Sequence, residues 1–568
     1  MPFPGIEDFR PTPDSIPPPN ALYRLKHPEG LPVHIYPLNP LDFVLRAAQI
    51  YPDKLAVAHP DVERPAYYSY AVWAQRIQNL AYALIRAGIQ PGDRVAVIAP
   101  NWFYVHHGVF AARAILTPVN TRLTKPEVDY ILDHSGSKLI LVDHEYTHLV
   151  KGAKVLVIIS NDTGRIGDPY EEFLSNGRRF SQEKGWQGLV TEKDEDAGAC
   201  LCYTSGTTGR PKGVLTTLRI NLSVVRAVSS VALNSKVMVV RILPMFHAAG
   251  WTYPWAITFA FASQITLRTV SYPHIWNHLL HSNVSHYCGA PTVQIGLVNA
   301  PEAKPLERPV SAIIAGSAPT AHLIGELEKR GIQPVHVYGL TYTLGPFTRN
   351  YFQPAWQHLS HEERSKMRAR QGHSFATAQE ARVVYASEEG NVSDGELKDV
   401  PKDGKTIGEV VTRGNIGETF YFRDPEATRK AFQGNHFHSG DLAIWHPDGS
   451  IGIVDRSKDI IISGGETDNA LQNASKLAEH PDVLEVSVVG RPHPKWGERA
   501  MAFVVLRGEV IEQWAKKHDK FAEDLKQHAR SRLPGFACPE WVEVVPELPK
   551  TSTGKILKTQ LRKYVAKL

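Results

Sequence analysis

The stretch Tyr203-Thr-Ser-Gly-Thr-Thr-Gly-Arg-Pro-Lys-Gly213 carries more information about fold and function than any other part of this chain. It combines three glycines, four aliphatic hydroxyl groups and the cation of Lys212. Glycine lets the backbone approach a ligand closely, and hydroxyl and main-chain N–H groups donate hydrogen bonds to phosphate oxygens. The apolar run 197–203 precedes the stretch and is typical of a buried strand. The pattern therefore predicts a strand that leads into a phosphate-binding loop.

This stretch is not a P-loop of the Walker type, which requires G-x-x-x-x-G-K-[ST]. The nearest fragment of that type, Gly404-Lys405-Thr406, has Asp399 in the position of the first glycine. The sequence therefore excludes a P-loop nucleotidase. An ordinary loop rich in glycine, serine and threonine is the alternative to a phosphate site.

Further segments follow in a fixed order along the chain. They are Leu243-Pro-Met-Phe-His-Ala-Ala-Gly-Trp251, Ala315-Gly-Ser-Ala-Pro319, Tyr338-Gly-Leu-Thr341, Phe437-His-Ser-Gly-Asp441, Asp455-Arg-Ser-Lys-Asp459 and Pro549-Lys-Thr-Ser-Thr-Gly-Lys555. Together with 203–213 they resemble the signatures of the adenylate-forming superfamily, which includes acyl-CoA synthetases, adenylation domains of peptide synthetases and luciferases. The resemblance spans nearly the whole chain. It is strongest to acyl-activating enzymes of the plant and fungal short- and medium-chain type.

The resemblance implies an ATP site built from three groups of residues. The phosphate group comprises Thr204, Ser205, Gly206, Thr207, Thr208, Gly209 and Lys212. The group around the adenine and the α-phosphate comprises Ser317, Ala318, Pro319, Tyr338, Gly339 and Thr341. The ribose group comprises Asp441 and Arg456. Because an aspartate after a glycine is also common in turns, a turn is the alternative for Asp441.

On the acyl side, the resemblance places His247 between the acyl site and the thiol tunnel as a catalytic residue, and it makes Trp251 a wall of the acyl pocket. It also makes Lys555 the catalytic lysine of the C-terminal domain. The alternatives are a packed histidine at position 247 and a solvated basic tail around Lys555, which lies near Lys550 and Lys558.

The chemistry of the family explains why these parts are needed. A carboxylate is a poor electrophile, and transfer of AMP from ATP, bound with Mg²⁺, converts it into a mixed anhydride with a good leaving group. Catalysis of this transfer is mainly positioning and electrostatic stabilisation. In relatives CoA then attacks the acyl adenylate after the C-terminal domain has rotated about a hinge, here Lys458, with Gly464 and Gly465 beside the CoA path.

Two segments depart from the family pattern. Tyr342 follows Tyr338-Gly-Leu-Thr341 in the position where relatives have a glutamate that helps to hold Mg²⁺. A phenol with a pKa of about 10 is neutral at working pH and is a poor ligand for a cation that prefers anionic oxygens. The segment 467–473 also differs, in the region presented during thioester formation. We therefore expect slower adenylation. That the chain is a homologue with impaired catalysis is the alternative.

Composition bounds the class of protein. With 568 residues, 43% of them hydrophobic, the chain is expected to bury several cores. A net charge of only +5 argues against nucleic-acid binding. The four cysteines have neither disulfide nor zinc spacing, which favours a reducing compartment. The most apolar long window, 248–267, is interrupted by glycine, proline and glutamine, so it predicts buried structure rather than a membrane span.

The two ends of the sequence bear on localisation. The first residues lack the basic-then-apolar pattern of a signal peptide. The last three, Ala566-Lys567-Leu568, conform to the small-basic-leucine pattern of a peroxisomal address. We expect a peroxisomal enzyme, and the alternative is a cytoplasmic enzyme whose last helix has a basic end.

Motif order and hydrophobic periodicity predict an α/β fold with two domains. The resemblance implies a large layered N-terminal domain of the adenylate-forming type over 1–455, which binds AMP and the acyl group. It also implies that the small α+β domain expected over 456–568 is mobile. Local patterns predict a helix at 72–84, strands at 94–98, 483–489 and 502–506, and a mostly helical segment at 511–533.

The expected function is that of an acyl-CoA ligase, which uses ATP to join a small or medium apolar or aryl carboxylic acid to CoA. The alternatives are an enzyme that passes acyl-AMP to a carrier protein or an amine, and a binding protein with impaired catalysis. Amino-acid substrates are disfavoured because no aspartate occurs between His247 and Tyr342, and a buried ammonium without a partner is costly. Trp251, Tyr253 and Trp255 predict an apolar or aromatic wall. The identity of the acid and the oligomeric state stay open.

Overall fold

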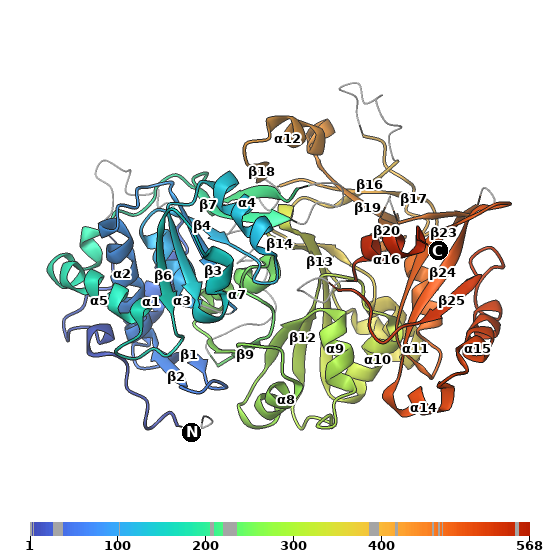
Figure 1. Ribbon diagram of the computed structural model, residues 1–568, viewed down its shortest axis with the longest axis horizontal. Coiled ribbons are helices and arrows are strands. Elements are labelled where there is room, and N and C mark those ends of the chain that lie inside the picture. Colours follow the sequence, from blue (N-terminus) through green and yellow to red (C-terminus); the bar gives the residue numbers. More distant parts are fainter. Residues whose placement is uncertain are drawn as a thin grey trace.

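The structure is a computed structural model of the chain (Figure 1). It describes residues 3, 5–25, 38–100, 103–204, 210–219, 236–385, 397–414, 419–456, 459–463, 466–468, 470–550 and 556–567. Only the backbone is described for residues 103, 104, 248–251, 419, 462, 466–468, 471 and 472. In these parts of the chain no helix has both the length and the apolar character needed to cross a bilayer.

Two large sheets form the body of the described structure. The first has nine strands in the order β15-β14-β13-β12-β11-β9-β10-β1-β2, and the second has seven in the order β18-β8-β7-β4-β3-β5-β6. The first sheet consists of β15 (His373–Ser374), β14 (Gly345–Arg349), β13 (Ile332–Leu340), β12 (Val310–Ile314), β11 (His286–Gly289), β9 (Met238–Arg241), β10 (Ser263–Thr266), β1 (Leu55–His59) and β2 (Ala66–Ser69). The second consists of β18 (Thr419–Tyr421), β8 (Lys212–Thr217), β7 (Gly198–Thr204), β4 (Ile115–Pro118), β3 (Arg94–Ile98), β5 (Leu139–Asp143) and β6 (Leu156–Ser160).

The central strands of both sheets are parallel, and their sequences are typical of parallel strands. Parallel strands are covered by helices on both faces and therefore read as continuous apolar runs. The predicted strand 94–98 is confirmed as β3, which pairs in parallel with β4 and β5. The predicted strand 197–203 is confirmed as β7, which begins and ends one residue later. Ligands of such sheets bind at the carboxyl ends of the strands.

Helices cover the faces of these sheets. Those of the large domain are α1 (Leu41–Ile50), α2 (Tyr70–Arg86), α3 (Phe103–Ala111), α4 (Lys125–Ser135), α5 (Pro169–Lys184), α7 (Ala248–Phe259), α8 (Tyr272–His281), α9 (Pro291–Val298), α10 (Ala321–Lys329), α11 (His361–Arg368) and α12 (Pro425–Ala431). The predicted helix 72–84 is confirmed as α2, whose N-terminus is capped because the Ser69 hydroxyl accepts a hydrogen bond from the Val72 N–H. The apolar window 248–267 forms α7 and β10, and most of its residues whose side chains are described are buried.

Two smaller sheets complete the fold. One consists of β16 (Arg382–Val384), β17 (Ile407–Thr412), β19 (Phe437–Trp445) and β20 (Ile451–Arg456). The other consists of β22 (Glu466–Asp468), β21 (Ile461–Ser463), β24 (Gly497–Leu506), β23 (Val483–His493) and β25 (Trp541–Val544). The last helices are α13 (Ala470–Leu477), α14 (Ile511–Trp514), α15 (His518–Arg530) and α16 (Lys558–Val565). The strands predicted at 483–489 and 502–506 are therefore confirmed but longer, and the helical segment 511–533 is divided in two.

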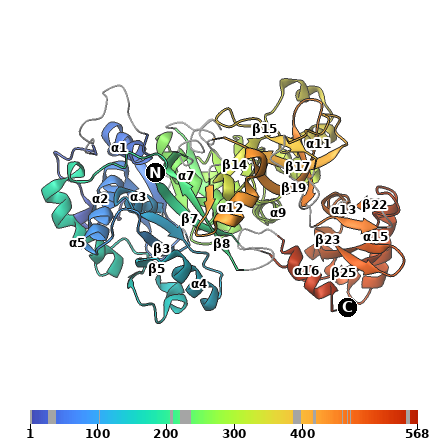
Figure 2. The same cartoon turned by 90° about the horizontal axis from the view of Figure 1, so that it is seen from above.

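The elements from β21 onward form a separate body at one end of the molecule in both Figure 1 and Figure 2. The largest apolar cluster is made of residues between Phe3 and Ile451, whereas two smaller clusters use only residues between Ile461 and Val565. The predicted α/β class is confirmed, with a large N-terminal domain and a smaller C-terminal domain. A boundary between residues 455 and 456 stays a prediction.

A buried ion pair ties two helices of the large domain together. Arg76 of α2 donates to both carboxylate oxygens of Glu171 in α5, at 2.6 and 2.5 Å, and both side chains are almost fully buried. Such a pair is costly to desolvate, but breaking it is worse because one buried charge is left unpaired.

We expect Glu171→Leu to lower the free energy of unfolding by roughly 3–5 kcal/mol, because the Arg76 charge stays buried. The double variant Arg76→Met/Glu171→Leu should recover most of this loss, since no charge is left. Urea unfolding of the two variants and the wild type measures both values. Equal losses in the single and the double variant would contradict this role of the pair.

Candidate functional site

The phosphate segment, residues 205–211, connects the antiparallel strands β7 and β8. Thr204 at the end of β7 is paired in register with Lys212 at the start of β8, so both residues stand at the base of the segment. The predicted residues Ser205, Gly206, Thr207, Thr208 and Gly209 lie outside the described residues. The structure shows the surroundings of Thr204 and Lys212, at the two ends of the segment.

The ammonium group of Lys212 lies between an aromatic ring and a carboxylate. Its Nζ atom is 4.8 Å from the centroid of the Tyr421 ring and 3.5 Å from Asp424 Oδ2. Asp424 also caps α12, because its other oxygen accepts a hydrogen bond from the Ala427 N–H. The Lys212 side chain is 49% exposed, so its charge can also reach an anion at the phosphate segment.

Tyr342 connects the predicted segment 338–341 to the phosphate segment. It lies in the short 3-10 helix η4 (Thr341–Thr343), directly after β13. Its hydroxyl oxygen is 3.4 Å from Thr204 Oγ1, within hydrogen-bonding distance. The Tyr342 ring packs against the rings of Tyr421 and Phe437, with centroids 5.3 and 4.9 Å away. The predicted phosphate and adenine segments are thus neighbours in space.

Asp441 has a partner on each carboxylate oxygen. The Tyr338 hydroxyl donates to Oδ2 at 2.8 Å, and Arg456 Nε lies 3.3 Å from Oδ1. Asp441 and Arg456 face each other across the antiparallel pair β19 and β20. Burial, and then the charge of Asp441, raise the pKa of Tyr338, so its phenol stays a donor. The structure therefore brings together Tyr338, Asp441 and Arg456, three of the residues predicted for the nucleoside.

Glu409 shapes the turn that presents Asp441, a role that the sequence did not predict. Its Oε1 accepts a hydrogen bond from the Gly440 N–H at 2.9 Å, and its Oε2 is 2.9 Å from His438 Nδ1. Gly440 has a φ of +71°, which favours glycine. Burial lowers the pKa of His438, but the hydrogen bond and charge of Glu409 outweigh it and raise that pKa overall.

The segment of Ser317, Ala318 and Pro319 lies at the same edge of the nine-stranded sheet as Tyr338. It follows β12, which is parallel to β13 and in register with it from Val310 to Ile314. Both segments therefore leave the sheet at its carboxyl edge, where ligands of parallel sheets bind.

The backbone around position 339 leaves no room for a side chain, so only glycine fits there. A Cβ atom at this position would lie 1.7 Å from the carbonyl oxygen of Gly345 on the neighbouring strand β14. The close approach of these backbones lets the chain leave β13 and turn into η4, which begins at Thr341. Thr341 itself lies one residue before Tyr342, beside the phosphate segment.

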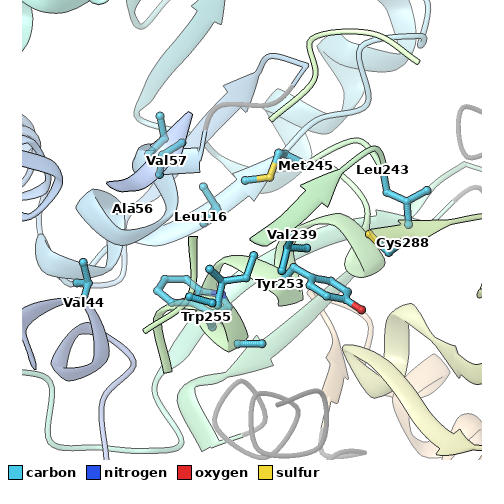
Figure 3. Close-up of a cluster of buried hydrophobic side chains, with 14 of the residues drawn as sticks. Val44, Ala56, Val57, Leu116, Val239, Leu243, Met245, Tyr253, Trp255 and Cys288 are labelled. Atoms are coloured by element: carbon cyan, nitrogen blue, oxygen red, sulfur yellow. The ribbon is translucent and has the colours of Figure 1, made fainter. Parts of the chain in front are cut away.

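A mostly apolar pocket lies between α7 and the carboxyl edge of the same sheet. It is lined by Leu243, Thr252, Tyr253, Cys288, Ile313, Ala315, Val337 and Pro346. The volume available to the centre of a water molecule is only about 10 Å³, close to the roughly 10–15 Å³ that one water needs. Figure 3 shows Leu243 beside Cys288, with Tyr253 between them and Trp255.

The aromatic wall expected from Trp251, Tyr253 and Trp255 stays a prediction. Trp255 is fully buried and does not line the pocket, because its ring stacks on Phe110 with centroids 4.7 Å apart and contacts His107. Successive positions on a helix point about 100° apart, so Tyr253 and Trp255 face different neighbours. His247 is half-buried and directly precedes α7, while for Trp251 only the helical backbone is described.

Two family models match the chain: "AMP-binding enzyme" over residues 44–422 and "AMP-binding enzyme C-terminal domain" over 474–555. The chain belongs to the AMP-binding enzyme family. The resemblance seen in the sequence is thereby confirmed.

Curated relatives of this AMP-binding enzyme are similar over nearly their full length. An acetate/butyrate–CoA ligase of Arabidopsis thaliana, named as peroxisomal, is 36% identical, with 94% of this chain and 95% of the relative covered. An acetate–CoA ligase of Humulus lupulus is 36% identical, with coverage of 92% and 94%. A peroxisomal benzoate–CoA ligase of Arabidopsis thaliana is 33% identical, with 93% of each chain covered.

Solved structures share the fold of this AMP-binding enzyme. The ATP-bound RpMatB-BxBclM chimera B1 has a TM-score of 0.77 at 25% identity and covers 93% of this chain and 99% of its own. A benzoate CoA ligase from Burkholderia xenovorans LB400 also has a TM-score of 0.77, at 20% identity, with coverage of 92% and 100%.

In this AMP-binding enzyme, ion pairs hold the C-terminal helix α16 beside the predicted hinge. Lys558 Nζ lies 3.5 Å from Asp455 Oδ1, and Arg562 forms an ion pair with Asp459. Asp455 and Asp459 flank the hinge position on either side, and α16 begins three residues after the predicted catalytic lysine. The positions themselves, Lys458, Gly464, Gly465 and Lys555, lie outside the described residues.

We expect Glu409→Ala to weaken AMP binding about tenfold, because a hydrogen bond to a charged group is worth roughly 1.5–3 kcal/mol and the turn before Asp441 loses its acceptor. Titration calorimetry with AMP measures the effect. Glu380→Ala, which removes an exposed carboxylate that pairs with Lys402, is the matched control. AMP binding that is equal in the two variants would show that Glu409 does not position Asp441.

Proposed function

We propose that this chain is an AMP-forming acid–thiol ligase, which activates a small apolar carboxylic acid with ATP and transfers the acyl group to CoA. The proposal extends to this chain the activity named for its relatives, which are CoA ligases of acetate, butyrate and benzoate over almost the same length. The large domain over 1–455 would hold ATP and the acid, and the small domain over 456–568 would supply the catalytic lysine.

The observation that carries the proposal is the position of the segment 338–342. Its first residue, Tyr338, holds Asp441, and its last, Tyr342, contacts Thr204. One short segment thus contacts both the candidate ribose site and the base of the candidate phosphate segment. A nucleotide that lies along 338–342 would have its ribose at one end and its terminal phosphates at the other.

The first step joins the acid to AMP. A carboxylate oxygen attacks the α-phosphorus of ATP, a new O–P bond forms, the bond from that phosphorus to the bridging oxygen breaks, and pyrophosphate leaves with both electrons of that bond. The negative charge that develops on pyrophosphate needs cations already in place. We assign this role to Lys212 at the β- and γ-phosphates and to Lys555 at the carboxylate and bridging oxygen. Mg²⁺ would arrive with ATP as part of the substrate.

The second step transfers the acyl group. The thiolate of CoA attacks the carbonyl carbon of the acyl adenylate, the thioester bond forms, and AMP leaves with the electrons of the C–O bond. We assign His247, at the start of α7, to the boundary between the acyl site and the thiol path. Rotation of the small domain about Lys458 would exchange Lys555 for the face around Gly464 and Gly465 between the two steps.

The pocket between α7 and the sheet is our candidate for the acyl site. Ala315, one of its lining residues, lies two residues before Ser317, the first of the residues 317–319 that we assign to the nucleotide, so the pocket adjoins the candidate AMP site. Its mostly apolar lining favours an acyl group without charge. Its small volume favours a short acid over a long-chain fatty acid.

The decisive experiment follows product formation by the purified full-length chain with ATP, Mg²⁺ and a panel of C2–C8 and aryl acids, with and without CoA. We expect AMP and a thioester to form only when CoA is present. Acyl-AMP that accumulates equally without CoA would instead indicate delivery to a carrier protein or an amine. No pyrophosphate release with any acid would overturn the proposal in favour of a binding protein with impaired catalysis.

Enlarging the pocket should shift the chain-length preference. We expect Val337→Ala to raise kcat/KM for an acid one or two methylenes longer than the best wild-type substrate by about fourfold, since one buried methylene is worth roughly 0.8 kcal/mol. Val400→Ala, another buried valine that does not line the pocket, is the control. An unchanged preference in Val337→Ala would place the acyl group elsewhere.

We also propose a peroxisomal location, from the last three residues, Ala566-Lys567-Leu568. The names of two of the relatives given above include a peroxisomal location, which supports the proposal. A fluorescent protein fused to the N-terminus of the full chain should enter peroxisomes, and the same fusion lacking 566–568 should not.

A further inference from the structure

Both nitrogen atoms of the His438 ring face oxygen atoms that accept hydrogen bonds. Nδ1 lies 2.9 Å from Oε2 of the Glu409 carboxylate, and Nε2 lies 3.2 Å from the carbonyl oxygen of Gln433. A neutral imidazole has one N–H group and one lone pair, so it can donate to only one of these two oxygens. The imidazolium has two N–H groups and satisfies both. The positions of the two acceptors therefore favour a protonated His438.

The ring is held between two elements and is largely removed from water. Glu409 lies on β17, and Gln433 lies in the short 3-10 helix η6 (Gln433–Asn435). The side chains of His438 and Glu409 are only 15% and 17% exposed. In such a place water replaces little of a lost hydrogen bond, so an acceptor left without its donor is costly. Loss of the proton from His438 would leave one acceptor facing a lone pair.

Glu409 supplies the negative charge beside the ring. Burial lowers the pKa of His438, but the hydrogen bond and charge of Glu409, followed by the Gln433 carbonyl, raise it above its ordinary value of about 6.5. On β19 itself, the Asp441 carboxylate is held by Tyr338 and Arg456. Charged side chains on the other elements around β19 are Arg382 on β16, Arg413 after β17, Asp455 and Arg456 on β20, and Glu426, Arg429 and Lys430 on α12.

His438 is connected to the candidate ribose site through Glu409. The second carboxylate oxygen of Glu409 accepts the hydrogen bond of the Gly440 N–H at 2.9 Å. The Ser439 hydroxyl donates to the Val410 carbonyl at 2.6 Å and accepts from the Asp441 N–H at 3.1 Å. The turn that presents Asp441 is thus attached to β17 at two points. One of these points is the carboxylate that pairs with His438.

We propose that His438 is a positioning residue whose proton controls nucleotide binding: the imidazolium fixes Glu409, Glu409 fixes the turn before Asp441, and loss of the proton weakens binding. The inference rests on the proposed function, because it concerns how the same site holds the nucleotide. The sign follows from the rise in the pKa of His438. Affinity is highest at low pH, where the ring is charged, and it is lost as the pH rises through that pKa.

Calorimetric titration of the full-length chain with AMP, from about pH 6 to about pH 9, tests this control. The AMP phosphate also titrates, with a pKa of about 6, so His438→Gln and the wild type are compared at the same pH. Near the low end we expect the variant to bind AMP about fivefold more weakly, because its amide carries no charge. Near the high end the wild-type ring is neutral, and the two should agree within about twofold. A residue that serves only as packing would give the same ratio throughout.

Two further measurements isolate the proton. His436→Gln is the matched control, because its ring lies two residues earlier and Nδ1 faces the carbonyl oxygen of Gly434 instead of a carboxylate. This variant should bind AMP like the wild type at every pH. Adenosine has no phosphate, and its binding to the wild type should weaken about fivefold as the pH rises across the range. The adenosine titration needs no variant, so it tests the inference even when His438→Gln fails to fold.

The outcomes separate this inference from the proposed function. Adenosine binding that is independent of pH, or that strengthens as the pH rises, overturns the inference alone. The same holds when the ratio of His438→Gln to wild type is equal at both ends of the range, or when His436→Gln shows the same pH-dependent loss. A wild type that binds neither AMP nor adenosine at any pH overturns the proposed function, and the inference with it.

Discussion

The pairing of one buried carboxylate, that of Asp441, is the constraint on which the site depends. A carboxylate removed from water is strongly destabilised unless charges and hydrogen bonds compensate it. Here the compensation comes from Tyr338 in β13 and Arg456 in β20, while the turn before Asp441 is held by Glu409 in β17. Each partner comes from a different strand, so the carboxylate is positioned only when these strands have packed together.

The segment 338–342 extends this constraint across the molecule. Tyr338 connects the nine-stranded sheet to the four-stranded sheet, and Tyr342 connects it to β7 and β18 of the seven-stranded sheet. Three sheets therefore meet where the chain leaves β13. The close backbone approach at Gly339 allows the turn at this place. In an enzyme that must align a nucleotide and an acid, such a junction fixes the relative positions of the residues that contact them.

The small domain is connected to this junction by polar contacts. Lys558 of α16 pairs with Asp455, and Arg507 donates a hydrogen bond to Asn299 Oδ1 of the large domain at 2.8 Å. The Arg507–Asn299 contact is exposed, whereas the Lys558–Asp455 pair is partly buried, with side chains 18% and 5% exposed. The proposed rotation of the small domain would break these contacts and replace them with others.

The sequence by itself determined the α/β class, the order of the family segments and several local elements, including β3, β7 and α2. It could do so because apolar periodicity, glycine and short-range hydroxyl patterns act over a few residues. The sequence did not reveal which side of α7 faces the pocket, because Trp255 packs on Phe110 and His107, far away in the sequence. Glu409 was missed for the same reason, since its partners Gly440 and His438 lie about thirty residues further on. Only the tertiary structure decided these pairings, because contact between distant residues depends on how the sheets pack against one another.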